Sequence, residues 1–303
     1  MNISTIPVVY NNAYDIAVPP THRFNGTKFS ELLKCLYSSG FANKLDFIKS
    51  SPVRYRDILR SHASDYVRRV STDTLLREEI RQINLPINNN LIKRSFLALN
   101  GTYKTALKAL ENSVACHAAG GTHHAHFSHG SGFCIFNDLA FTAVNLIEHG
   151  QVNNVLILDL DVHQGDGTID ICREKTGIYT CSLHCEQNYP FEKRKGTRDV
   201  ALDRHLEDKA YLHQLHRTLN EVSEEFTPDI VLYDAGVDVF FGDKLGNLNL
   251  TLDGILKRDC HVLEHFKRRN IPIATVIGGG YDPSDIEIAK RHVSIFSAVN
   301  NVF

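Results

Sequence analysis

The stretch from Val155 to Gly167 reads VLILDLDVHQGDG and decides the fold. Its first four residues are an uninterrupted run of Val, Leu and Ile, which is typical of a strand buried on both faces of a parallel sheet. Asp159, Asp161 and His163 then alternate with apolar residues, so their side chains point to one face at the carboxyl end of the strand. Open α/β sheets bind their ligands at this end of the strands.

Three titratable groups at the end of a buried strand are costly unless a cation compensates them. A carboxylate and an imidazole two residues apart suit a divalent metal. The alternative is that Asp159 and Asp161 cap loops and that His163 is a hydrogen-bonded core residue. Taken alone, the stretch fits the metal and the caps equally well.

Composition narrows the class of protein. With 43% hydrophobic and 22% charged residues, the 303-residue chain has the make-up of a soluble globular protein. A net charge of -2 with dispersed Lys and Arg predicts no nucleic-acid binding, and no apolar run approaches the roughly 20 residues of a membrane-spanning helix. Seven cysteines without CxxC pairs and a polar start without a secretory signal predict a reducing, cytoplasmic location.

Strand-like and helix-like segments alternate along the chain, which predicts βαβ units, a mainly parallel sheet and a single domain over residues 1–303. The segment Ile83 to Leu91 is polar and broken by proline, so we expect a surface loop there. A helix over 91–113 is expected to be interrupted at Gly101-Thr102. The other expected strands are 6–10, 155–160, 178–183, 229–233 and 271–277, and the other expected helices are 28–38, 65–70, 137–148, 167–174, 206–225, 252–268 and 283–299.

Three further polar clusters each follow an apolar strand. GGTHHAHF places His123 and His124 after two glycines, which allow the backbone to approach a ligand closely. YDAGVD brings Asp238 to a glycine turn, and GGGY ends the last strand with Tyr281. Three glycines at a strand end pack poorly, so we expect them to let Tyr281 reach into a site; a tyrosine merely packed at the rim is the alternative.

Together these clusters contain the groups needed for metal-assisted hydrolysis of an amide. Asp161, His163 and Asp238 offer one nitrogen and two carboxylate oxygens, a donor set that suits a catalytic Zn²⁺ with an open position for water. The remaining predicted roles are general base and acid, orienting carboxylates and an oxyanion donor. These fall to His123 and His124, to Asp159 and Asp166, and to Tyr281, respectively.

The four motifs GGTHHAHFSHGSGFCIFND, LDLDVHQGDGT, YDAGVDVFFGD and GGGY occur in the order and approximate spacing of the histone deacetylase family, which the chain resembles over most of its length. The segment FGDKLGNLNLTLDGILKRD and the triplet His22-Arg23-Phe24 are most similar to class IV and related bacterial members. The resemblance implies the arginase-deacetylase fold, a three-layer α/β/α sandwich.

The resemblance also implies roles for individual residues. It implies one Zn²⁺ at Asp161, His163 and Asp238, the His dyad and Tyr281 as above, and a structural K⁺ beside the zinc. That K⁺ would be held by Asp159, by the backbone carbonyls of Asp161, His163 and Leu183, and by the hydroxyl of Ser182. The substrate tunnel would be lined by Gly132, Phe133, Gly279 and Gly280, with Tyr189 as the opposite wall.

The implied activity is removal of an acetyl or longer acyl group from the lysine side chains of proteins. A deacetylase of acetylpolyamines or of another small amide is the alternative, and a non-catalytic sensor of acyl ligands is a further one. An arginase-like ureohydrolase with two manganese ions needs more carboxylates, yet Gly165 stands two residues after His163.

The chain departs from the family pattern at three places. Asp234-Ala235-Gly236 replaces the usual Asn-Ala-Gly before the zinc aspartate, and Asn25-Gly26-Thr27 follows Phe24 where related members often have Pro-Met. The loop Leu85 to Asn90 contains no carboxylate, although several classes use an acidic residue there to hold the substrate backbone. The rim of the site is therefore expected to differ from that of its relatives.

Overall fold

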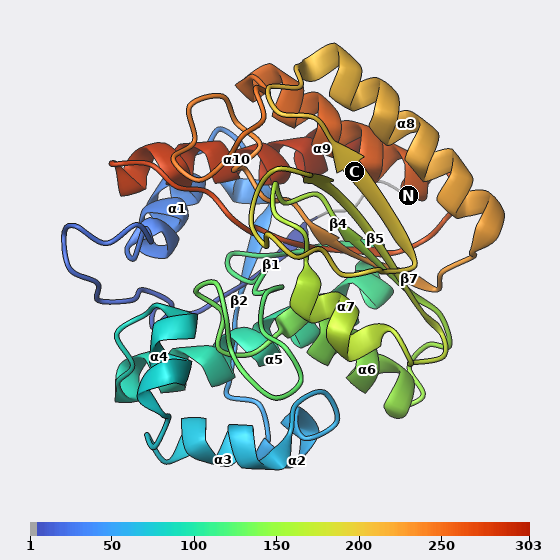
Figure 1. Ribbon diagram of the computed structural model, residues 1–303. Helices are drawn as coiled ribbons and strands as arrows, with labels where there is room; N and C mark the ends of the chain where they lie inside the picture. Colours follow the sequence, from blue (N-terminus) through green and yellow to red (C-terminus); the bar gives the residue numbers. More distant parts are fainter. Residues whose placement is uncertain (1–4) are drawn as a thin grey trace.

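The computed structural model describes residues 5–303, so the first four residues of the predicted domain lie outside the described residues. Its centre is an eight-stranded sheet in which every pairing is parallel, with the order β2-β1-β3-β8-β7-β4-β5-β6 (Figure 1). The strands are β1 (Ile6–Tyr10), β2 (Leu45–Lys49), β3 (Val114–His117), β4 (Val155–Asp159), β5 (Ile178–Cys185), β6 (Arg198–Leu202), β7 (Ile230–Asp234) and β8 (Ile273–Val276).

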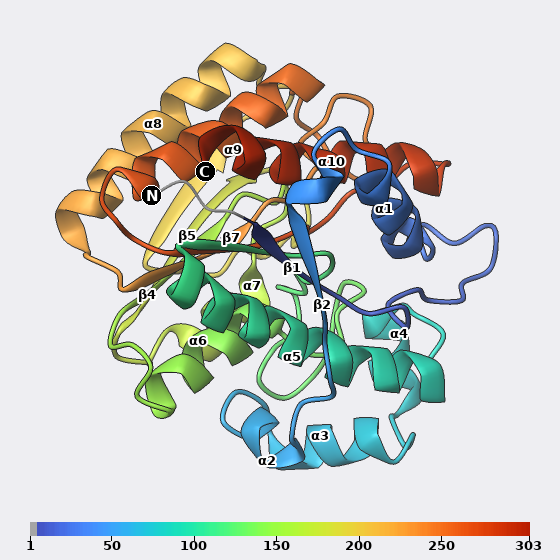
Figure 2. The same cartoon turned by 180° about the vertical axis from the view of Figure 1, so that it is seen from behind.

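Helices cover both faces of the sheet, which confirms the predicted three-layer α/β/α arrangement (Figures 1 and 2). One layer contains α1 (Lys28–Tyr37), α8 (Asp208–Glu225), α9 (Leu252–Lys267) and α10 (Asp285–Val302). The other contains α5 (Asn89–Asn112), α6 (Asp138–Glu148) and α7 (Asp166–Cys172), and beyond α5 lie the short helices α2 (Tyr55–Ile58), α3 (Ser64–Ser71) and α4 (Arg77–Ile83). None of the helices within residues 5–303 is both long and apolar enough to cross a bilayer.

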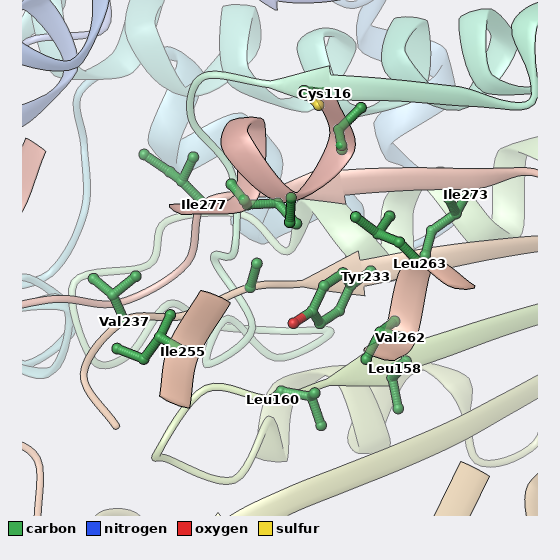
Figure 3. Close-up of a cluster of buried hydrophobic side chains, with 14 of the residues drawn as sticks. Cys116, Leu158, Leu160, Tyr233, Val237, Ile255, Val262, Leu263, Ile273 and Ile277 are labelled. Carbon is green, nitrogen blue, oxygen red and sulfur yellow. The ribbon is translucent and has the colours of Figure 1, made fainter. Parts of the chain in front are cut away.

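Strand β4 lies in the interior of the sheet, between β5 and β7, and all five of its residues are buried. Leu156 and Leu158 join the hydrophobic cluster beneath α9 and α10, whereas Val155 and Ile157 join the cluster beneath α6 (Figure 3). Each fully buried aliphatic side chain of this kind contributes roughly 1.5–3 kcal/mol to stability. The uninterrupted apolar run is thus explained by two covered faces.

The predicted interruption of the helix over 91–113 is wrong, because α5 is continuous from Asn89 to Asn112. A Cβ at Gly101 would overlap the His117 ring and the Tyr14 hydroxyl. The glycine therefore allows the helix to pack closely on β1 and β3 instead of ending it. The predicted loop before this helix is present between the end of α4 at Ile83 and the start of α5.

Within residues 5–303, the strands β2 and β6, the short helices α2 and α4 and the 3-10 helix at Ala42–Lys44 were not predicted. Both strands lie at the edges of the sheet and contain exposed charged residues, so LDFIK and RDVAL lack the apolar run of an interior strand. The two helices have only four and seven residues, too short for a clear helical period.

His62, between α2 and α3, joins this small helical region to the rest of the molecule. It is fully buried, its Nδ1 donates to the His126 carbonyl at 3.0 Å, and its Nε2 accepts the Asn137 N–H at 3.1 Å. Burial lowers the pKa of His62 from 6.5 to about 4. Protonation of Nε2 would break the bond to Asn137, the residue that caps α6.

We expect His62 to make the protein less stable in mild acid. Because its pKa is lower in the folded chain than in the unfolded chain, only the unfolded chain binds a proton as the pH falls from 6.5 toward 4. The loss reaches roughly 3 kcal/mol at pH 4. Urea unfolding at several pH values should show a shallower pH dependence for His62→Gln than for the wild type, and identical slopes would contradict the assignment.

Candidate active site

The carboxyl edge of the sheet brings together the residues predicted to hold a metal. Asp161 and His163 lie in the loop after β4, and Asp238 lies in the loop after β7. All three are buried, and their ligand atoms lie within 4.8 Å of one another. His163 Nδ1 is 2.9 Å from Asp161 Oδ1 and 3.1 Å from Asp238 Oδ2.

The three side chains fit a divalent cation. Burial alone would lower the pKa of His163, but its hydrogen bonds to Asp161 and Asp238 raise it to about 10. The imidazolium thus supplies the positive charge that two buried carboxylates require, and a metal ion would replace its proton. One nitrogen and two carboxylate oxygens are the donors of a catalytic zinc site.

Backbone amides fix the orientation of both carboxylates. The Val162 N–H donates to Asp238 Oδ1 at 2.8 Å, and the Gly279 N–H donates to Asp161 Oδ2 at 2.8 Å. Gly279 approaches so closely that a Cβ there would overlap a carboxylate oxygen of both aspartates. The second glycine of the GGGY motif is therefore packed against the carboxylates of Asp161 and Asp238, two of the three residues of the proposed metal group.

We expect Gly279→Ala to weaken divalent-metal binding about tenfold or more, as disturbed neighbours of metal ligands do. The added methyl group must push Asp161 or Asp238 out of position. Competition with a chromophoric chelator would measure the affinity. Gly40→Ala is the matched control, because nothing lies within 4 Å of a Cβ at Gly40. Unchanged affinity in Gly279→Ala would contradict this prediction, because it would mean that the backbone at residue 279 moves away without disturbing Asp161 or Asp238.

The two adjacent histidines lie beside this group, each bonded to its own carboxylate. His123 Nδ1 is 2.7 Å from Asp159 Oδ2, and His124 Nδ1 is 2.7 Å from Asp166 Oδ1. Asp159 and Asp166 therefore lie where the sequence predicted orienting carboxylates. The glycines on both sides of Asp166 suggest an exposed turn, but that expectation is wrong, because Asp166 is buried at the start of α7.

The histidines differ in their protonation equilibria. Burial and the neighbouring charge of His123 lower the pKa of His124 to about 4. Burial also acts to lower the pKa of His123, but Asp159 and Asp161 outweigh it and raise that pKa well above 6.5. At neutral pH His124 is the neutral imidazole of the pair, and it can accept a proton.

Asp138, at the start of α6, holds the loop that carries these histidines. It accepts hydrogen bonds from the Thr122 N–H and hydroxyl, both at 2.7 Å, and from the Gly121 N–H at 3.2 Å. Sequence analysis assigned no role to Asp138. The Asn-Asp pair that opens a helix within the first motif is the signal that could have found it.

Tyr281 is almost fully buried at the end of the GGGY segment. Its backbone N–H donates to Asp243 Oδ2 at 2.7 Å, and Asp243 Oδ1 accepts the N–H groups of Leu245 and Gly246 at 2.9 Å. Its ring centroid is 6.2 Å from that of His163. Asp243 was also not predicted, although an Asp followed by a glycine two or three residues later is typical of such a turn.

Two cavities meet at these residues. The outer one, the mouth, has a volume of about 590 Å³, and Gly132, Phe133, Tyr189 and Tyr281 line it together with His124 and His163. The inner cavity is much smaller, about 30 Å³, and contacts Asp161, Gly279 and both dyad histidines. Of the five residues predicted to line the tunnel, Gly279 lines only the inner cavity. Gly280 lines neither and packs against Val237 and His292.

Two cationic side chains line the inner cavity and were not predicted from the sequence. Lys28 and Arg94 are both buried and line it. Lys28 Nζ donates to the Gly278 carbonyl at 3.1 Å, and Arg94 Nε donates to the Tyr14 carbonyl. Each side chain comes from a helix, α1 or α5, whose amphipathic pattern did not set these residues apart.

A second buried group contains His123, Asp159 and Asp234, whose ligand atoms also lie within 4.8 Å of one another. Both carboxylate oxygens of Asp234 lack a hydrogen-bond partner among residues 5–303. Asp159 also pairs in register with Ser182 of β5, and Ser182 and Leu183 are buried next to it. The residues implied for a monovalent cation are thus adjacent, with the Ser182 hydroxyl bonded to His184 Nδ1 at 3.0 Å.

Fold and site define an α/β protein with a parallel eight-stranded sheet and a buried His/Asp group suited to a metal ion at its carboxyl edge. The chain belongs to the histone deacetylase family, whose domain matches residues 22–296. This membership supports a hydrolase of the deacetylase type.

The chain is also similar to individual proteins over most of its length. An uncharacterized protein from Picosynechococcus sp. is 38% identical over 98% of this chain and 99% of its own length. Histone deacetylase 2 of Arabidopsis thaliana is 28% identical over 97% of this chain and 79% of its own. The crystal structure of an HDAC homolog complexed with SAHA matches with a TM-score of 0.81 at 24% identity, over 98% of this chain and 84% of that chain, which confirms the predicted fold.

Proposed function

We propose that the protein is a zinc-dependent amidohydrolase that removes an acetyl or other acyl group from lysine side chains of proteins. The observation that carries the proposal is the convergence of three groups at the base of one mouth. The His/Asp metal group, a neutral histidine bonded to a carboxylate, and a buried tyrosine all lie there.

Asp161, His163 and Asp238 would hold the Zn²⁺, and the backbone amides that orient the two aspartates support this role. When bound, the ion supplies a Lewis acid that polarises the acyl carbonyl and lowers the pKa of water. We further propose that Asp159, Ser182 and the nearby carbonyls hold a structural K⁺, which would offset part of the buried negative charge of Asp159.

His124 is the proposed proton acceptor. Its Nδ1–H donates to Asp166, which leaves Nε2 free to accept a proton from the attacking water. A low pKa keeps this nitrogen unprotonated at neutral pH. The protonated ring can then give its proton to the leaving amine, as general acid–base catalysis requires. His123, held by Asp159, supplies positive charge next to it.

Tyr281 is the proposed oxyanion donor. Burial and the charges of Asp161 and Asp238 raise the pKa of its hydroxyl well above 10, so the hydroxyl keeps its proton. It can therefore donate a hydrogen bond to the oxygen of the acyl group as negative charge develops there. Asp243 holds the backbone of Tyr281 in place for this contact.

The acyl group is proposed to be short. The inner cavity of about 30 Å³ has room for one or two water molecules, which matches a methyl group better than a long chain. Acetylpolyamines and other small amides present the same carbonyl and remain the alternative substrates. The further alternative, a non-catalytic sensor, would bind these molecules without releasing amine.

Amine release from acetyl-lysine and long-chain acyl-lysine peptides, with N-acetylspermidine beside them, tests the proposal. Zinc-loaded wild type should release acetate from the acetyl peptide and leave a free lysine amine in it, and chelation should abolish turnover. Metal analysis should find one zinc per chain. Turnover that survives full removal of the metal would contradict the mechanism, and two tightly bound divalent ions would favour the ureohydrolase class.

A further inference from the structure

The charged side chains that line the mouth outside the metal and dyad residues are all positive. Two arginines, Arg23 and Arg81, are among its lining residues, and no Asp or Glu is among them. Lys244 is exposed next to the lining residue Leu245. The absence of a carboxylate from the loop after α4 leaves this wall without an acidic residue.

Neighbouring carboxylates neutralise this wall only weakly. Arg81 lies 3.1 Å from Glu78, but both side chains are about three-quarters exposed, at 76% and 75%. Exposed pairs of this kind contribute little and leave the arginine able to meet another anion. Across residues 5–303, no carboxylate lies within ion-pair distance of Arg23. Glu192, which follows the lining residue Phe191, is exposed.

The two arginines are held on the same wall. Arg81 lies in the last turn of α4, and Asn84 caps that helix. His22 Nε2 donates to the Asn84 carbonyl at 3.0 Å, while His22 Nδ1 accepts the Phe24 N–H at 3.0 Å. These bonds fix the residues on both sides of Arg23 against the end of α4. In both views the segment before α1 runs past α4 (Figures 1 and 2).

Another part of the lining is uncharged and largely aromatic. It contains Asn188, Tyr189 and Phe191, and Phe191 is 91% exposed. Phe191 therefore presents an exposed apolar surface to any peptide that enters the mouth. The mouth therefore combines cationic groups with an exposed apolar surface.

We propose that the mouth selects acyl-lysine in acidic protein segments, with the side chains of neighbouring Asp or Glu residues meeting Arg23 and Arg81; this rests on the proposed function above. Complementary charge raises both encounter rate and affinity, whereas like charge disfavours a partner. An acetylated polyamine carries positive charge on the part that extends from the site, so the same arginines repel it. The charge of the mouth thus distinguishes the two substrate classes.

The test uses three acetyl-lysine peptides of equal length, with Asp, Ala or Lys on both sides of the acyl-lysine, and N-acetylspermidine. We expect kcat/KM to fall in the order Asp, Ala, Lys, with roughly a tenfold difference between Asp and Lys at low salt. The difference should shrink at high salt, because exposed charges are screened. Arg23→Glu/Arg81→Glu should reverse the order. Arg217→Glu, on α8, is the matched control and should preserve it.

Equal rates for the Asp and Lys peptides, or a preference for Lys or for N-acetylspermidine, would overturn the inference while leaving the deacylase function intact. Binding supplies a readout that does not need turnover: fluorescence anisotropy with zinc-loaded Tyr281→Phe should show tighter Kd for the Asp peptide. If no peptide is turned over by wild type, the proposed function fails. In that case equal Kd values would overturn the charge preference as well.

Discussion

Replacing Tyr281 by phenylalanine is expected to lower kcat by at least about 10²-fold while zinc stays bound, because the variant loses only the hydroxyl that meets the developing oxyanion. The aromatic ring keeps its contacts with Phe133 and His163, and the backbone keeps its bond to Asp243. Steady-state kinetics on an acetyl-lysine peptide, with zinc analysis of the same sample, measures the effect.

A small change in KM should accompany this loss, since the interaction is made mainly in the transition state. Tyr55→Phe is the matched control, because Tyr55 is a partly exposed tyrosine on α2. Normal turnover in Tyr281→Phe would remove the tyrosine from the mechanism, and loss of zinc in that variant would make the loss of activity uninterpretable as an oxyanion effect.

Asp161→Asn is expected to abolish zinc binding and to reduce kcat/KM by more than about 10²-fold, since even residues that only orient metal ligands contribute 10- to 100-fold. The substitution preserves shape and removes one negative charge. Burial alone would raise the pKa of Asp161, but His123 and His163 outweigh it and hold that pKa well below its usual value, so the charged carboxylate stabilises the chain without metal. The melting temperature of Asp161→Asn should therefore fall below that of the wild type.

Added zinc should change the melting temperature of the wild type but not that of Asp161→Asn. It should raise the melting temperature of the wild type, because a ligand that binds only the folded chain stabilises it, and should leave that of Asp161→Asn unchanged. Asp65→Asn, an exposed substitution on α3, is the control and should respond to zinc as the wild type does. A zinc-dependent shift in Asp161→Asn would show that the metal binds elsewhere, with the group of His123, Asp159 and Asp234 as the first place to look.

Much of the fold followed from the apolar runs of interior strands. The strands β4, β7 and β8 were predicted from such runs, which occur because all of their residues are buried. The edge strands β2 and β6 were missed for the opposite reason. Gly101 misled the prediction because its role depends on a contact with His117, which lies on another element.

The sequence also predicted the residues with the most distinctive chemistry in the site, but it did not predict the residues that hold them in position. Titratable or aromatic residues directly after an apolar strand, such as His163 and Tyr281, can be recognised from the sequence alone. Residues whose role depends on a contact with a distant part of the chain cannot be recognised in this way. Asp138 and Asp243 orient the dyad loop and Tyr281 through backbone amides, and Lys28 reaches the inner cavity from a helix far away in the chain.

The order of the strands has a consequence for how the protein is made. Strand β8 lies between β3 and β7, and it is the only strand that joins β2-β1-β3 to β7-β4-β5-β6 in the sheet formed by residues 5–303. The histidines follow β3, whereas the metal group follows β4 and β7. On a ribosome, these two halves remain separate sheets until residues 273–276 have emerged. Completion of the site therefore requires residues 273–276, and a nascent chain stopped before β8 would expose two unpaired strand edges to chaperones.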